Sequence, residues 1–175
     1  MAAPGMGADV EKTGLRTAVS IAVFLFAMDT LVLGTSTLAL FALAVVVFWM
    51  IPRTLYSLRN RANFRIRAVH VAVYSIMVVA SVAAFAANNY LAERRAKEVI
   101  KQVYDFKDNQ HQYPRRLDDM VPEYMSTVPC AKITLLFGKF GYTTVGGYPT
   151  LMYYGWAPFE RRCYNFESRR WYILD

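Results

Sequence analysis

The sequence predicts a membrane α-helical anchor of three transmembrane helices that carries a small α+β domain. In that domain a long N-terminal helix packs on an antiparallel sheet of about four strands. The anchor is predicted because 55% of the residues are hydrophobic and gather in residues 17–51 and 68–87, where charges are nearly absent. The domain is predicted because an amphipathic helical pattern after residue 87 is followed by short β-branched and aromatic runs.

The first apolar run covers residues 14–51, nearly twice the length of about 20 residues that one membrane helix needs. The turn-forming residues Gly34-Thr35-Ser36-Thr37 interrupt it. This interruption favours a transmembrane helical hairpin of residues 15–33 and 36–51, and we expect Pro52 to end its second helix. A single long tilted or kinked helix is the alternative.

Charges around these segments predict the topology. Residues 1–13 are small and polar and contain Gly and Pro, so we expect a disordered N-terminus, with no signal peptide. Residues 52–67 form a basic loop, which is typical of the cytoplasmic side of a membrane. Lys12 and Arg16 then place the N-terminus in the cytoplasm and residues 88–175 outside a bacterial inner membrane. The topology-determining arginines of the loop are Arg53, Arg59, Arg61, Arg65 and Arg67.

Asp29 is an intramembrane carboxylate in the first predicted helix. Such a group is costly in lipid, so it is by default a candidate functional residue, in a proton path or as the partner of a cation. The alternative is a local role near the outer end of the helix, where Asp29 bonds to hydroxyls such as those of Thr30, Thr35 or Ser36.

The third apolar segment, 68–87, is rich in Ser and Ala in its outer half, which allows close helix packing in lipid. No Gly or Pro interrupts residues 68–112, so we expect one helix to leave the membrane and become amphipathic. Its outer part has a favourable Glu93–Lys97 pair. The apolar stripe that predicts packing on a sheet consists of Ala92, Ala96, Val99, Val103 and Phe106.

The soluble region, 113–175, begins with a turn-rich bridge over residues 115–129 and continues with short strands. Gly146-Gly147 is a hairpin signal between two of them. The β-branched or aromatic runs are residues 133–137, 141–145, 151–156, 162–166 and 171–174.

No chemical site stands out. The sequence has no P-loop, GxSxG, HExxH or CxxC pattern, so it predicts no catalytic, cofactor-binding or metal site and no small-molecule substrate. His111 with Asp118 and Asp119 is the one candidate general base with carboxylates, and a solvated helix end is the alternative. The net charge of +7 is explained by membrane-flanking arginines, so we expect membrane lipid and membrane proteins as partners, and no nucleic acid.

Two further groups have open interpretations. Cys130 and Cys163 could form one disulfide if the domain lies outside the cytoplasm, or they are two buried thiols. Paired arginines could bind lipid headgroups or an acidic partner, or alternate along strands as solvated edge residues. These pairs are Arg115-Arg116, Arg161-Arg162 and Arg169-Arg170.

A longer pattern resembles a known family. Behind the apolar-to-amphipathic helix come Tyr104, then Tyr113-Pro114-x-x-Leu117-x-x-Met120-Val121-Pro122-x-Tyr124, then Val128-Pro129. This resembles the segment after the long helix of type II secretion pseudopilins and type IV pilins. The resemblance covers residues 68–175 and is sharpest at 104–129. It implies a small antiparallel sheet, a C-terminal cysteine pair (Cys130 and Cys163) and assembly in a pilus or secretion-type machine.

The chain departs from pilins in two ways. Residues 1–13 lack the prepilin leader pattern, and the pilin-like helix follows a hairpin, so three membrane segments would oppose extraction into a filament. We therefore expect a non-enzymatic accessory or scaffold component with an outward-facing domain that acts through protein–protein contacts. An accessory subunit of an unrelated respiratory or transport complex is the alternative. A membrane-anchored enzyme that uses His111 is the third hypothesis.

Overall fold

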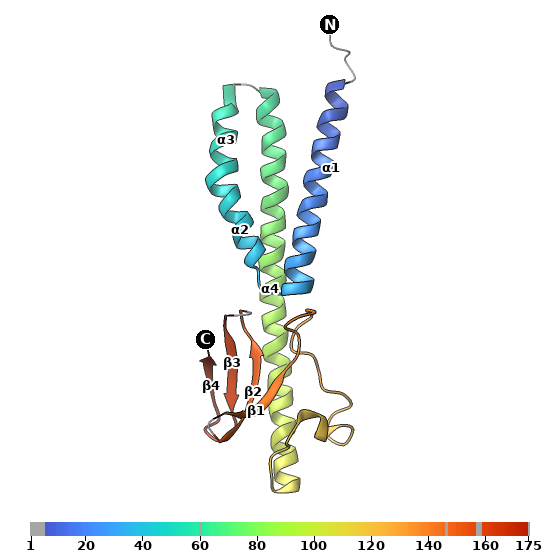
Figure 1. The fold of residues 1–175 in the computed structure, drawn as a ribbon, viewed down its shortest axis with the longest axis vertical. Helices are drawn as coiled ribbons and strands as arrows, with labels where there is room; N and C mark the ends of the chain where they lie inside the picture. Colours follow the sequence, from blue (N-terminus) through green and yellow to red (C-terminus); the bar gives the residue numbers. More distant parts are fainter. Residues whose placement is uncertain (1–5, 60, 146, 157–158, 175) are drawn as a thin grey trace. The chain divides into compact units, whose positions relative to one another are not determined.

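The computed structural model describes residues 6–59, 61–145, 147–156 and 159–174, without the side chains of 6–12, 59 and 61–63. The described residues form helices and a four-stranded antiparallel sheet (Figure 1). The chain divides into two compact units. The apolar unit consists of Met1–Thr30 and Ser36–Ala84, and the sheet unit of Leu31–Thr35 and Phe85–Asp175.

Helices make up the apolar unit. In chain order they are α1 (Met6–Ala27), the π-helical turn η1 (Met28–Leu33), α2 (Thr37–Val45), the π-helical turn η2 (Val46–Met50), α3 (Ile51–Tyr56), the 3₁₀ turn η3 (Ser57–Arg59) and the first part of α4 (Arg61–Gln110). Among the described residues, three helical stretches are long and apolar enough to cross a membrane. They are Thr13–Leu33, Thr37–Tyr56 and Phe64–Gln110.

The first two stretches are separate helices, as the turn signal predicts, and not one long helix. Between them Gly34 has φ 64° and Ser36 has φ 57°, values that an α-helix does not allow.

The N-terminus differs from the expectation of disorder, because α1 begins at Met6. Residues 1–5 lie outside the described part of the chain.

Pro52 does not end the second helix as the sequence analysis expects. It lies in the first turn of α3, directly after η2. The helix continues past the proline, and the π-helical turn η2 directly before it changes the backbone hydrogen-bond pattern where the proline has no N–H group to donate. The chain stays helical to Arg59, and α4 begins at Arg61, so the basic segment 52–67 is helical on both sides of residue 60.

Small and medium side chains form the interior of the apolar unit. Ala22, Ala42, Met77 and Val78 are buried together. The Ser36 hydroxyl donates to the carbonyl of Ser81 over 3.4 Å. Many large apolar side chains of the same helices point outward, which is the distribution expected of helices made for an apolar solvent. They include Phe24, Phe41, Phe48, Trp49, Ile76 and Val79.

The sheet unit joins the second part of α4 to four strands in the order β1 (Gly141–Val145), β2 (Tyr148–Tyr154), β3 (Arg161–Asn165) and β4 (Arg170–Leu174). All neighbouring strands are antiparallel, and the sheet lies alongside α4 in Figure 1. The predicted four-stranded α+β arrangement is therefore present. Its core combines the helix stripe with the inner face of the sheet: Ala92, Ala96, Val99, Val103, Leu151, Tyr153, Tyr164 and Phe166.

The hairpin between β1 and β2 agrees with the glycine signal, because Val145 pairs with Tyr148 and Gly147 has φ 87°. The run 133–137 was expected to be a strand, and this prediction is wrong. Its backbone does not join the sheet ladder. Instead Leu135 and Leu136 donate hydrogen bonds to the carbonyls of Leu31 and Val32.

Candidate functional site

Two tyrosines of the pilin-like pattern, Tyr104 and Tyr113, pack around one phenylalanine. Phe166 follows β3 and is 1% exposed. Four tyrosine rings surround it with centroid distances of 5.2–5.8 Å: Tyr104, Tyr113, Tyr142 and Tyr164. The hydroxyls of Tyr104 and Tyr113 both donate to the Phe166 carbonyl, over 2.9 and 3.3 Å. These contacts fix the end of the sheet to α4 and to the chain that follows it.

The bridge after α4 is held by its apolar pattern residues. Pro114, Leu117, Met120 and Met125 are buried. Leu117 and Met120 belong to the 3₁₀ helix η4 (Leu117–Met120), whose spacing turns both toward the core. The other pattern residues contribute less to this anchoring: Tyr124 stacks on Phe106 at 5.2 Å, Pro129 is half-buried, and Pro122 is exposed after a cis peptide bond. The pattern is thus structural, and it presents no reactive group.

The His111 hypothesis gains no geometric support. His111 is exposed directly after α4, with φ 56°, a left-handed conformation typical of the residue that ends a helix. Asp119 accepts a hydrogen bond from the Arg116 backbone N–H over 2.8 Å, and so caps η4. Asp118 is exposed in the same turn. Among the described residues, no three His, Cys, Asp or Glu side chains form a group that could hold a metal ion.

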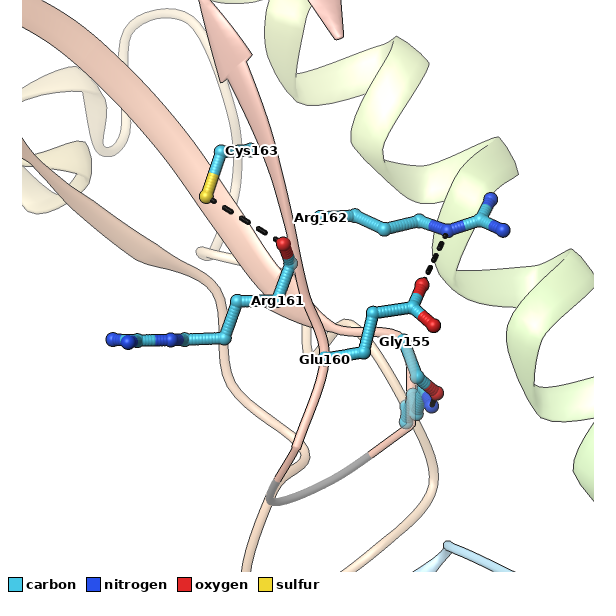
Figure 2. A network of polar contacts seen from close by, with 6 residues as sticks. Gly155, Glu160, Arg161, Arg162 and Cys163 are labelled. Carbon is cyan, nitrogen blue, oxygen red and sulfur yellow. Dashed lines mark hydrogen bonds and ion pairs between the residues drawn. The ribbon is translucent and has the colours of Figure 1, made fainter. Parts of the chain in front are cut away.

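Cys130 and Cys163 are both free thiols in the structure, which gives the disulfide interpretation no support. Cys130 is exposed and its backbone forms an isolated bridge with Lys139. Cys163 is buried in β3, opposite Met152 of β2, and its Sγ lies 3.8 Å from the Arg161 carbonyl (Figure 2). Burial raises the pKa of the Cys163 thiol, so the thiolate needed for disulfide chemistry is disfavoured.

The arginine pairs have separate local partners. The Arg161 and Arg162 side chains point to opposite sides of β3, as strand alternation predicts (Figure 2). Arg162 donates to Glu160 over 3.3 Å. Arg169 lies in the turn before β4 and its guanidinium stacks 5.4 Å from the Tyr104 ring. These contacts favour structural roles for Arg162 and Arg169.

Lys132 is a buried charge that the sequence analysis does not identify. Its side chain is 2% exposed, and its Nζ donates to the Gly155 carbonyl over 2.7 Å and lies 5.3 Å from the Phe85 ring. Burial lowers the pKa of Lys132 to about 8, while nearby Glu160 raises it and Arg162 lowers it further. Because lysines are rarely buried, the sequence gives little reason to expect a buried Lys132. The one signal is the apolar run that follows it.

Asp29 has a local structural role. The carboxylate is 2% exposed and accepts hydrogen bonds from the backbone N–H groups of Leu38 and Ala39, each over 3.2 Å. These N–H groups belong to the first turn of α2, which has no side-chain cap from Ser36. Asp29 therefore caps the second helix of the hairpin across the turn. The donors to this carboxylate include backbone amides of the following helix, a kind of partner that the sequence does not suggest.

The basic segment is only partly described, because the side chains of Arg59 and Arg61 lie outside the described residues. Arg67 donates to the Arg53 carbonyl over 2.9 Å, and the Arg53 guanidinium lies 5.8 Å from the Trp49 ring. Arg65 is exposed. The described arginines thus lie at one end of α3 and α4, where a membrane-flanking basic cluster would be.

A groove in the sheet unit is the candidate protein-binding surface. It has a volume of about 520 Å³ and carries both charges and apolar groups. Its lining residues are Arg116, Leu117, Asp118, Val128, Pro129, Cys130, Lys139, Phe140 and Tyr142. Mixed linings of this kind are typical of sites that bind protein segments rather than small apolar ligands.

Comparisons with models of protein families, with curated proteins and with solved structures found no match to the chain. Its function must therefore be inferred from its residues and their geometry.

Proposed function

We propose that the chain is a three-span integral protein of a bacterial inner membrane, with a cytoplasmic N-terminus and an outward sheet unit. Three helical stretches of sufficient length and apolarity support the spans. The arginines that flank α3 and the start of α4 support the orientation.

The sheet unit acts as a pseudopilin-like, non-enzymatic interaction domain in a pilus or secretion-type assembly. One observation carries this proposal: α4 runs unbroken over 50 residues, from an apolar span into the stripe that packs on an antiparallel sheet. That architecture is what the resemblance at residues 104–129 implies. A buried aromatic cluster in place of a reactive cluster supports a role through contacts.

A fixed membrane component suits the chain better than a filament subunit. Extraction into a filament would have to pull three spans from lipid. The turn between the first two spans also belongs to the sheet unit, to which it is tied by backbone hydrogen bonds. We therefore assign an accessory or scaffold role.

The experiment is affinity purification from native membranes in mild detergent, with quantitative mass spectrometry. We expect pilus or secretion components to co-purify with the wild-type chain and to be lost from an Asp118→Lys/Lys139→Glu variant of the groove. Lys101→Glu, an exposed change on α4, is the matched control and should keep the partners. Recovery of a respiratory or transport complex without secretion components would reject the proposal.

That rejecting outcome would support the second candidate, an accessory subunit of an unrelated membrane complex. The observation in its favour is a small-residue surface on α4, where Ala83, Ala86 and Ala87 are exposed. Small residues allow a partner helix to approach closely in lipid. Replacing Ala86 with Phe should then release the complex, whereas the groove variant should retain it.

A further inference from the structure

The loop over residues 133–136 exposes large aliphatic side chains, which water-soluble proteins usually bury. Ile133 is 60% exposed, Leu135 79% and Leu136 61%. The loop carries no charge between Lys132 and Lys139. Contiguous exposed apolar side chains of this kind indicate an interaction surface.

One tether joins this loop to the end of the first candidate span. The Leu135 N–H donates to the Leu31 carbonyl over 2.9 Å, and the Leu136 N–H donates to the Val32 carbonyl over 3.3 Å. Leu31 and Val32 are in η1, the last apolar turn of that span. The loop backbone therefore lies at the depth of this turn.

A second tether joins the loop to α4. The Ile133 N–H donates to the Asn88 side-chain oxygen over 3.2 Å. Asn88 is the first polar residue after the apolar segment 68–87, where the third span should leave the hydrocarbon. Two spans thus place the loop at the same boundary.

A close approach at Gly34 is a third contact between the loop and the turn after the first span. A Cβ atom at Gly34 would overlap the Thr134 methyl group, so the turn and the loop are in direct contact. Tyr90, two residues beyond Asn88, is 72% exposed, and Trp156 stacks on Phe159 next to the Gly155 carbonyl that holds Lys132. Tyr and Trp are enriched where protein meets the membrane–water interface.

We propose that the loop 133–136 inserts its aliphatic side chains into the outer leaflet, with phospholipid as its partner. The inference rests on the proposed membrane insertion of the spans. Lipid is the chosen occupant because the tethers set the depth of the loop at the ends of two spans, where lipid is the surrounding solvent.

The test uses single tryptophan probes in a Trp49→Phe/Trp156→Phe/Trp171→Phe chain. The full chain is reconstituted in phosphatidylethanolamine–phosphatidylglycerol vesicles, with and without brominated acyl chains. The probes are Leu135→Trp in the loop, Ile76→Trp in the apolar unit and Ile173→Trp in β4, all at exposed positions. We expect the Leu135 probe to lose emission to a degree comparable with the Ile76 probe, and the Ile173 probe to keep it.

An unquenched Leu135 probe beside a quenched Ile76 probe would overturn the lipid proposal alone and leave a protein occupant. An unquenched Ile76 probe would overturn the proposed membrane insertion itself. Nitroxides on Leu135→Cys, Ile76→Cys and Ile173→Cys, in a Cys130→Ser/Cys163→Ala chain, give the same comparison through oxygen accessibility. These spin-labelled variants test whether the loop lies in lipid if the chain without its three native tryptophans fails to fold.

Discussion

Helix α4 is one helix with two different distributions of side chains. In the apolar unit its large residues Ile76 and Val79 point outward, while Met77 and Val78 are buried. In the sheet unit small and medium apolar residues of the helix are again buried, but its exposed side carries charged pairs such as Glu93–Lys97, joined over 2.8 Å. The difference indicates that each part is made for a different solvent.

Under the proposed membrane insertion, the two units draw their stability from different sources. In water, the burial of apolar surface supplies roughly 25 cal/mol per Å² and dominates folding. In lipid this driving force between helices is lost, and close packing and satisfied polar groups take its place. Substitutions of the same kind should consequently have unequal effects in the two units.

Replacing Phe166 with Ala should give the largest loss. The side chain is the centre of the aromatic cluster, and removing it should lower the free energy of unfolding of the sheet unit by about 3–5 kcal/mol. Phe48→Ala, at an 81% exposed position of the apolar unit, is the matched control and should change stability little. Denaturant unfolding in micelles, followed by near-UV circular dichroism, measures both. Equal losses would contradict the comparison.

Lys132 should make the stability of the sheet unit depend on pH. Its folded-state pKa is about 8 and its unfolded-state pKa about 10.5, so the unfolded chain binds more protons between these values. Stability should rise with pH across this window by up to about 3 kcal/mol. Below about pH 8 both states are charged, and the cost of burial is constant.

The Lys132→Met variant supplies the control for this titration. Burial raises the pKa values of Tyr142 and Tyr153, which opposes the lysine effect at high pH in both proteins. The difference between the two stability curves therefore isolates Lys132. If that difference does not change between about pH 8 and 10.5, the side chain is hydrated rather than buried.

Gly34→Ala should have a smaller effect, about 2 kcal/mol, because the left-handed conformation is strained for any other residue and the new Cβ would overlap Thr134. Gly14→Ala, with open space around its Cβ position, is the matched control. Thermal unfolding and protease cleavage at the turn are the measurements. A Gly34→Ala/Thr134→Ser variant should recover part of the loss, and no recovery would place the cause in the backbone strain alone.

Substitutions of Asp29 should have the smallest effect on stability, and they distinguish a structural helix cap from a functional carboxylate. The amides of α2 bond to the two different oxygens of Asp29, so Asp29→Asn keeps an acceptor for one of them and should cost about 1 kcal/mol, whereas Asp29→Leu leaves both amides without this acceptor and should cost about 1–3 kcal/mol. Complementation of a deletion strain provides the second readout. Full activity of the Asn variant supports the cap, and its loss would restore the proton-path or cation-binding hypothesis.

Local sequence patterns predicted the structure correctly where neighbouring residues determine it. The alternating runs at 141–145 and 171–174 became strands, and Gly34 marked the turn of the hairpin. Local patterns were insufficient for residues 133–137, whose composition is that of a strand. Their hydrogen-bond partners at Leu31 and Val32 lie about one hundred positions earlier, beyond any local pattern.

The same limit applies to the candidate sites. Asp29 was recognisable as unusual, but its partners depend on how the turn brings the first amides of α2 back to it. Burial of Lys132 depends on a single carbonyl at Gly155, 23 positions away. Cys130 and Cys163 looked like a pair because no other cysteine exists and because the resemblance to pilins implies one, but the fold places Cys130 at an exposed bridge and buries Cys163.

Cysteine labelling along α4 tests the central claim most directly. A membrane-impermeant maleimide is added to intact spheroplasts that contain single-cysteine variants of a Cys130→Ser/Cys163→Ala chain. The cysteines replace Ile76, Val79, Lys101 and Asp105. The account predicts no labelling at Ile76 and Val79, which face lipid, and ready labelling at Lys101 and Asp105 from the outer side. Labelling of Ile76, or labelling of Lys101 only after the membrane is opened, would contradict a helix that passes from lipid into an outward domain.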